Sequence, residues 1–327
     1  AAMNGHRRLV SCLLDMGANP VPYEVAGQYH DDTYANWTDE LRHRGHAATA
    51  DTIEAAVSSR YGPPLDDANV HAAVVQDDVD RVVALLHAKP ERAWQVNVVG
   101  NAPLHLAAVT GSVEIARLLI EHGAPIDAVN GDLRTPAVIA LYGLHRYWRN
   151  DAKPPLLDLL LAEGAEYTML IAASVGDERR VQEILRVDAG AGNAADSCRR
   201  RPLSGAVANR HAKVVHLLLA HGADPNAKEA VCQGGYSLRH AAAAGDADIV
   251  QALLHHGAVP QHWVDSSGDA MFGAYHGGHD AIAHMLYAHG GTMELQVYAA
   301  KHRIDVIAEV LALDPSKADS VLPYGWD

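Results

Sequence analysis

The chain has 327 residues and a formal net charge of -14, and hydrophobic residues make up 49% of it. This composition is too apolar for a disordered protein, and no apolar run reaches the roughly 20 residues that span a membrane. The acidic excess argues against general nucleic-acid binding, which needs a basic surface. We therefore expect a folded chain with no membrane span and no nucleic-acid partner.

Cysteine and phenylalanine are both scarce. The three cysteines, Cys12, Cys198 and Cys232, lie far apart, and one would be left over from any disulfide pairing. This pattern favours a reducing compartment, and no apolar stretch typical of a signal peptide follows the N-terminal basic residues. The expected location is the cytoplasm. With one Phe in the chain, the core must consist mainly of aliphatic and small residues.

The first 66 residues predict an irregular region. Residues 7–20, RRLVSCLLDMGANP, resemble the second helix of a helix pair whose first helix is cut short. The segment 27–40, GQYHDDTYANWTDE, reads as an insertion, and residues 41–57 predict a further helix pair. Another pair is predicted at residues 67–86, where a more regular region begins.

The clearest unit covers residues 100–130. Pro103 suits the first turn of a helix, where its missing N–H costs nothing. Gly111 is expected to end this first helix. Val113 to Glu121 carries the apolar stripe of a second helix, and Gly123 supplies the left-handed residue that ends it.

The same pattern recurs along the chain. The turns between the two helices of each pair align at intervals of 32 to 35 residues, at Gly111, Gly143, Gly176, Arg210, Gly245 and Gly278. A shorter pair follows at residues 294–311. A period of about 33 residues is that of an ankyrin array, and we count roughly ten units.

These residues resemble the ankyrin-repeat family over nearly the whole chain. The resemblance is carried by PLHLAA at 103–108, HGADPNA at 221–227, and the segments 118–124 and 253–258. It implies an all-α solenoid of stacked helix-turn-helix units with short finger loops. We expect one solenoid over residues 1–327, which is a fragment of a longer array. Its expected parts are irregular units at 1–66, regular units at 67–293 and a short unit at 294–327.

The resemblance also implies that a partner protein binds in a concave groove formed by the fingers and first helices. Three departures from the regular pattern mark this region: the insertion 145–155 between two helices of one unit, the finger 191–202 with three arginines, and the finger 259–269 with a Trp. Arginine and aromatic residues are common anchors of interfaces. The predicted contact residues are Arg134, Tyr147, Trp148, Arg199, Arg200, Arg201, Gln233, Tyr236, Trp263, Asp265 and Asp269.

The 21 histidines have a structural interpretation. The resemblance implies that His105 bonds to neighbouring loops. Four others precede a capping glycine near a helix C-terminus, where a cation is favoured: His122, His221, His256 and His289. A zinc site would need three or four convergent ligands. The nearest candidates are His276, His279, Asp280, His255 and His256, for which we favour the structural interpretation.

Two alternatives to an interaction scaffold stay open. In the first, the insertions 27–40 and 145–155 close a pocket, and the protein is an enzyme or binds a small molecule or a metal. In the second, it is a bacterial effector, because its Ala-, Arg- and His-rich composition is typical of a bacterium of high G+C content. Cys198 lies beside three arginines that would favour its thiolate, but no motif for catalysis accompanies it. We therefore predict no catalytic residue, no bound metal and no cofactor.

Overall fold

The computed structural model describes residues 7–15, 41–61, 70–97, 100–131, 133–142, 154–196, 199–229, 235–262, 268–291 and 304–319. The chain divides into two compact units, Ala1–Thr168 (unit 1) and Met169–Asp327 (unit 2), and each is described by itself. Every regular element assigned in these residues is a helix, which confirms the expected all-α class. The prediction of one continuous solenoid over 1–327 stays a prediction.

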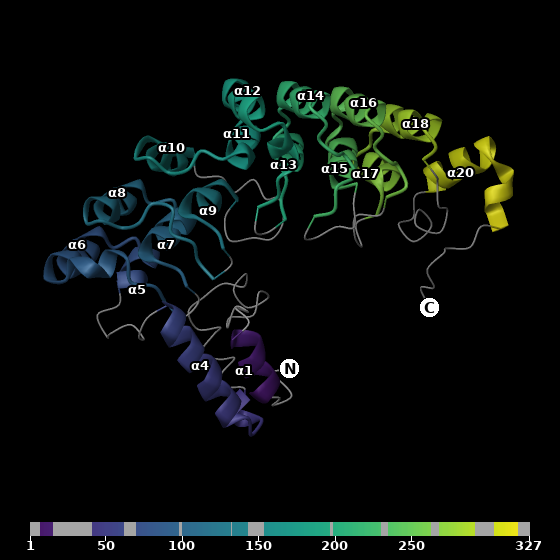
Figure 1. Ribbon diagram of the computed structural model, residues 1–327. Helices are drawn as coiled ribbons and strands as arrows, with labels where there is room; N and C mark the ends of the chain where they lie inside the picture. Colours follow the sequence, from purple (N-terminus) through teal and green to yellow (C-terminus); the bar gives the residue numbers. More distant parts are fainter. Residues whose placement is uncertain are drawn as a thin grey trace. The chain divides into compact units, whose positions relative to one another are not determined.

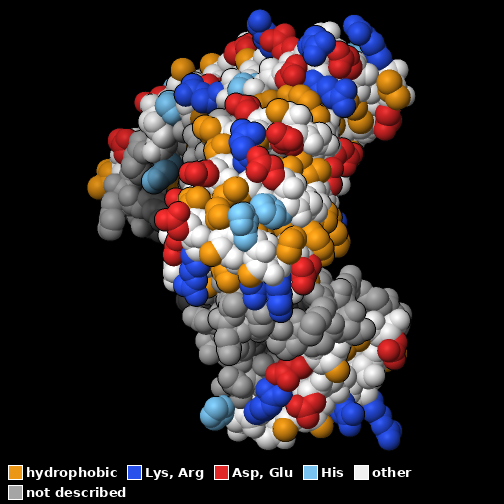
Figure 2. All heavy atoms as spheres, turned by 90° about the vertical axis from the view of Figure 1, so that its left-hand side faces the viewer, with side chains coloured by type: hydrophobic (Ala, Val, Ile, Leu, Met, Phe, Trp, Pro, Cys, Tyr) orange, Lys and Arg blue, Asp and Glu red, His pale blue; other side chains and the backbone are white. Residues whose placement is uncertain are grey.

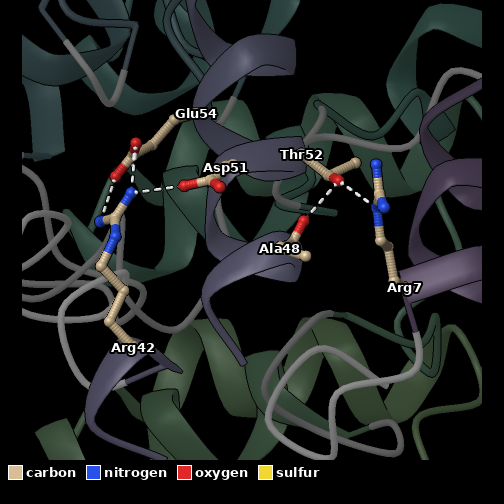
Figure 3. A network of polar contacts seen from close by, with 6 residues as sticks. All are labelled: Arg7, Arg42, Ala48, Asp51, Thr52 and Glu54. Atoms are coloured by element: carbon tan, nitrogen blue, oxygen red, sulfur yellow. Dashed lines mark hydrogen bonds and ion pairs between the residues drawn. The ribbon is translucent and has the colours of Figure 1, made fainter. Parts of the chain in front are cut away.

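Unit 1 begins with two helices, α1 (Arg7–Asp15) and α4 (Ala47–Tyr61), which pack together. Figure 3 shows the polar contacts along α4. Arg7 Nε donates to Thr52 Oγ1 at 3.1 Å, and so joins the two helices. Arg42 donates hydrogen bonds from Nη1 and Nη2 to the two oxygens of the Glu54 carboxylate, each at 2.7 Å. Its Nη2 also donates to Asp51.

Three helix pairs follow in unit 1. Each pair has a first helix and a second helix, and first helices pack on first helices while second helices pack on second helices. The pairs are α5 (Val70–Val75) with α6 (Val79–Ala88), α7 (Pro103–Thr110) with α8 (Val113–Glu121), and α9 (Pro136–Tyr142) with α10 (Pro154–Ala162). A short 3-10 helix, η2 (Pro90–Ala93), follows α6. The bounds predicted for α8 are confirmed.

The described residues of unit 2 show the same arrangement in four helix pairs. Figure 1 shows the second helices in one row and the first helices in another row beneath them. The pairs are α11 (Met169–Val175) with α12 (Glu178–Val187), α13 (Pro202–Ala208) with α14 (Ala212–Ala220), α15 (Tyr236–Ala244) with α16 (Ala247–His255), and α17 (Ala270–His276) with α18 (Asp280–Ala288). The remaining elements are η3 (Ala189–Asn193), α20 (Ile304–Leu313) and η4 (Pro315–Asp319).

The turn between the two helices of a pair has one recurring backbone geometry. The residue two positions before the second helix has a positive φ, in the left-handed region that favours glycine. Among the predicted turn positions that the structure describes, φ is 81° at Gly111, 80° at Gly176, 60° at Arg210, 78° at Gly245 and 75° at Gly278. Asp77, with φ 55°, lies at the same place between α5 and α6. This geometry confirms the alignment of the described turns, including the departure at Arg210. The predicted turn at Gly143 lies outside the described residues.

The helix C-termini also follow the prediction. Gly123 and Gly222 have φ of 87° and 84°, so both are left-handed residues that end a second helix. The preceding His122 and His221 each donate Nδ1–H to the carbonyl four residues earlier, at 2.8 Å. His256 and His289 make the same bond. Each ring therefore adds a side-chain hydrogen bond to the last turn of its helix. The carbonyls of Leu118, Leu217 and Ala252 also accept the backbone N–H of the same histidine.

The core is aliphatic, as the composition predicts. It consists of Leu, Ile, Val and Ala side chains between the helix rows, with Tyr142 and Tyr275 as its large aromatic members. The single phenylalanine, Phe272, is only half-buried on α17.

The insertion 27–40 lies outside the described residues, and so do 145–153 of the second insertion. Its last two residues, Pro154 and Pro155, are the first residues of α10, because Pro is accepted in the first turn of a helix. The insertion therefore ends two residues earlier than predicted. None of the described helices is long and apolar enough to cross a membrane.

Candidate functional site

In the part of the chain that the structure describes, the finger loops contain the same turn at three equivalent places. The first residue of each turn, Asn97, Asn130 or Asp196, pairs its N–H with the carbonyl four residues later, at 2.9 to 3.1 Å. Its side-chain Oδ1 accepts the N–H of that same later residue, at 2.7 to 3.0 Å. We call these five-residue segments finger turns. The first residue thus makes two hydrogen bonds to the fifth, one through its backbone N–H and one through its side chain. These bonds hold the backbone of the turn and so set the directions of the fourth and fifth side chains.

The three arginines of the finger in unit 2 consequently have three different surroundings. Arg199 is the fourth residue of its turn, has φ 57° and is exposed. Arg200 is the fifth residue, and only 2% of it is exposed. Arg201 donates to the Asn193 carbonyl and, at 3.3 Å, to the Lys228 carbonyl. Only Arg199 has its charge fully on the surface.

Two further predicted contact residues are also buried. Arg134 is the fifth residue of the finger turn that begins at Asn130 in unit 1, and it is 1% exposed. Asp269 is 6% exposed, and its Oδ1 accepts the Phe272 N–H at 2.9 Å, so it caps the N-terminus of α17. Together with Arg200, these residues are corrected from surface contacts to structural positions, because the turn or the cap directs each side chain inward.

Of the six remaining predicted contacts, the structure describes one, Tyr236. Tyr236 is the first residue of α15 and is half-buried. The residues outside are Tyr147, Trp148, Gln233, Trp263 and Asp265.

Two of the aromatic rings on the first helices of unit 2 each stack on a histidine one turn later. Tyr236 stacks on His240 with ring centroids 5.5 Å apart, and its Oη lies 3.4 Å from His240 Nδ1. Phe272 stacks on His276 with centroids 5.8 Å apart. We call these four residues the aromatic face. A Cβ added at Gly273 would lie 2.9 Å from the Arg239 carbonyl oxygen, so α15 and α17, which carry this face, are in close contact.

The electrostatics of the aromatic face centre on His240. Burial of its ring lowers the pKa of His240, and the neighbouring Arg239 lowers it further, whereas Asp246 acts in the opposite direction. The ring therefore favours its neutral form, which is the form that best packs against Tyr236.

A buried polar cluster lies beneath this face. Ser204 Oγ donates to Glu229 and lies 3.2 Å from Ser237 Oγ. All three residues are buried. In unit 1 the place of Ser204 is taken by His105, the third residue of its first helix. His105 Nδ1 accepts the Ala102 N–H at 3.0 Å, so Nε2 carries the proton and donates to the carbonyls of Ala128 and Arg134. The predicted role of His105 is confirmed.

The sequence analysis does not single out Phe272 or His240, and it names His276 only as a candidate metal ligand. Their signal was present as an aromatic residue and a histidine four positions apart on a first helix, where side chains lie on one face. Among the described residues no group of three His, Cys, Asp or Glu side chains could hold a metal ion. His276, His279, Asp280, His255 and His256 thus form no such group.

Two family models match the chain. One, described as ankyrin repeats in three copies, matches residues 169–262, and one, described as an ankyrin repeat, matches residues 99–131. The first covers α11 to α16, and the second covers α7 and α8. Both matches therefore fall on helix pairs with the turn geometry described above.

Individual relatives share parts of the chain. The B-cell lymphoma 3 protein homolog of Mus musculus is 32% identical over 208 residues, which cover 59% of this chain and 44% of that protein. The ankyrin repeat domain-containing protein 13C of Danio rerio is 38% identical over 87 residues, 26% of this chain and 17% of that protein. The chain thus spans less than half the length of these relatives. Both are eukaryotic and give no support to the predicted bacterial source.

The crystal structure of the ankyrin repeat domain of Bcl-3 is similar to 65% of this chain and to 95% of that domain, at 27% identity and a TM-score of 0.36. The assignment does not depend on this likeness. It depends on the helix pairs, the recurring left-handed turn and the family matches, which coincide. The chain is an ankyrin-repeat protein.

Proposed function

We propose that the chain is a protein-interaction scaffold, and that its aromatic face and the neighbouring finger turn bind a segment of another protein. The observation that carries the proposal is the position of the single phenylalanine. Phe272 lies half-buried on a first helix beside exposed His276, not in the aliphatic core. Aromatic rings that keep an accessible side are frequent anchors of interfaces.

The rigidity of the stack supports this proposal. The rings are held by stacking and by helices that pack directly on each other. A receptor surface that is formed before binding loses little conformational entropy when the partner arrives. The predicted contacts Trp263, Asp265 and Gln233 lie outside the described residues and remain part of the proposal. Tyr147 and Trp148 belong to unit 1, lie outside the described residues and stay separate predicted contacts.

A protein is a better candidate partner than a nucleic acid, because the net charge of -14 disfavours a polyanion at long range. The cytoplasm is the proposed location, on the cysteine pattern alone.

The test is capture of proteins from a lysate by the whole chain and by two variants. Tyr236→Ala combined with Phe272→Ala removes both rings of the aromatic face. Tyr287→Ala is the matched control, because Tyr287 lies on the second helix α18 and is 40% exposed. The proposal expects proteins that the parent and the control capture and the double variant loses. Equal capture by all three chains would refute it, provided circular dichroism shows unchanged helix content.

A further inference from the structure

The charges around the aromatic face indicate the chemistry of the partner. We infer that the aromatic face binds an acidic segment of another protein, with carboxylates placed on Arg199 and Lys228 and an apolar side chain placed on Tyr236 and Phe272. This inference rests on the proposed function and adds the class of partner to it.

The exposed charges of the finger turn and first helices in unit 2 are cationic. Arg199 is exposed at the fourth position of its finger turn. Lys228 is exposed on the next loop. Its carbonyl oxygen accepts a hydrogen bond from Arg201 Nε, which places the two loops side by side. Arg239 is half-exposed on α15, one turn from Tyr236. The cations therefore lie on two neighbouring loops and on the helix that carries Tyr236.

The acidic residues of the same segments have structural roles. Glu229 and Asp269 are buried, and they accept hydrogen bonds from Ser204 Oγ and the Phe272 N–H. Asp196 Oδ1 accepts the Arg200 N–H within the finger turn. Asp188 and Asp224 are exposed, but they lie where the loops leave the second helices, and each accepts a nearby backbone N–H.

The second helices of unit 2 carry a different charge pattern. Glu178 of α12 pairs with Lys213 of α14 at 3.4 Å, and His216 of α14 lies 3.2 Å from Asp248 of α16. On the face of the molecule shown in Figure 2, acidic and basic side chains likewise lie interspersed among apolar ones. Arg199, Lys228 and Arg239 carry charge of one sign, and complementary charge on a partner would supply both specificity and rate of association.

An acidic peptide fits these observations better than a nucleic acid does. The exposed cations are few, whereas a nucleic acid needs many phosphate contacts to overcome the repulsion of a chain with net charge -14. A peptide needs only two or three carboxylates and an apolar side chain at matching positions.

The test is a selection of random displayed peptides on the whole chain, followed by affinity measurements with labelled synthetic copies. The double variant Arg199→Leu with Lys228→Leu removes both exposed cations. Leu is compatible with this turn, because Leu133 occupies the equivalent position in unit 1 with φ 59°. Lys213→Leu on α14 is the matched control. Tyr236→Ala with Phe272→Ala tests the proposed function separately.

We expect the selected peptides to carry net negative charge and to bind the parent more weakly at high salt. Their affinity for the double charge variant should be at least about tenfold weaker, and their affinity for the Lys213→Leu control nearly unchanged. Neutral or basic peptides that lose affinity only with the ring variant would overturn the inference and leave the proposed function standing. Peptides insensitive to the ring variant, or no selected peptide, would overturn both. Tight binding of a labelled single-stranded RNA that the charge variant abolishes would replace the acidic peptide and also overturn the inference.

Discussion

Unit 1 and unit 2 stack the same kind of helix pair but connect neighbouring repeats with different side chains. In unit 1, His71 and His105 donate from buried first helices to carbonyls of the next loop. In unit 2, the corresponding connection at Ser204 is a hydroxyl-to-carboxylate bond to Glu229. The same stacking of helix pairs is therefore compatible with different hydrogen bonds between neighbouring repeats, provided that buried polar groups have partners.

The loops near the second helices differ in the same way. In unit 2, Asn226 donates to the Gly257 carbonyl at 2.8 Å and accepts the Val259 N–H at 2.9 Å, and Asn193 makes the same two bonds one repeat earlier. In unit 1, the equivalent Asp127 only accepts, from the Glu166 N–H at 3.1 Å. The finger turns differ too, with Leu133 in unit 1 where unit 2 has Arg199. Unit 2 thus combines a cationic finger with the aromatic face.

The largest expected effect is the response of unit 1 to acid. Burial lowers the pKa of both His71 and His105 to about 4, from an ordinary value of 6.5. The unfolded chain therefore binds more protons than the folded chain between pH 6.5 and 4, and the free energy of unfolding falls as the pH is lowered through this range. Each histidine contributes about 3 kcal/mol to the fall.

Urea denaturation of the parent and of His105→Gln at a series of pH values measures this effect. The variant should show the shallower pH dependence, whatever its stability at neutral pH. His221→Gln, which changes an exposed ring in unit 2, serves as the control. Parallel curves for parent and His105→Gln would show that His105 is not the source of the acid sensitivity.

The next largest effect is expected at the glycines that end second helices. Gly222→Val should lower the free energy of unfolding by about 2 kcal/mol, because a β-branched residue resists the left-handed conformation. A Cβ at Gly222 meets no atom within 4 Å, so the cost is conformational and not steric. Gly123→Val should cost a similar amount in unit 1, and Gly222→Asn much less. Unchanged thermal unfolding of both Val variants would reject the assigned role of these glycines.

A smaller effect should separate Asn226 from Asp127. Asn226→Asp replaces the amide donor to the Gly257 carbonyl with a carboxylate oxygen, which repels that carbonyl oxygen. The change should lower the free energy of unfolding by about 1 to 2 kcal/mol. Asp127→Asn keeps its acceptor and should change the stability by less than about 0.5 kcal/mol. Chemical denaturation of the two variants compares them, and equal losses would remove the distinction between the two units.

The smallest expected effects are gains at the two turns that lack glycine. Asp77→Gly should raise the free energy of unfolding by about 0.5 to 1 kcal/mol, because it relieves a left-handed non-glycine residue. Arg210→Gly should gain less, since it also removes the contact of Arg210 with Asp246 at 2.6 Å. A loss of stability with Asp77→Gly, seen in the same denaturation assay, would contradict the turn assignment in unit 1.

Much of the fold could be predicted from the sequence because local signals agree with one another. Gly111, the stripe from Val113 to Glu121, and Gly123 all specify the same helix ends. The site was less predictable. Three consecutive arginines look equivalent in a sequence, and only the finger turn separates exposed Arg199 from buried Arg200. Asp269 looked like a surface contact because its capping role depends on where α17 begins.

The measurement that tests the central claim most directly is photo-crosslinking in a lysate, with a benzophenone amino acid placed at Tyr236 in one chain and at Tyr287 in another. The two positions lie on a first helix and a second helix of the same unit. The account predicts a discrete crosslinked protein from position 236 and none from position 287. Crosslinks from position 287 alone, or none from position 236, would contradict the claim that the aromatic face binds a partner.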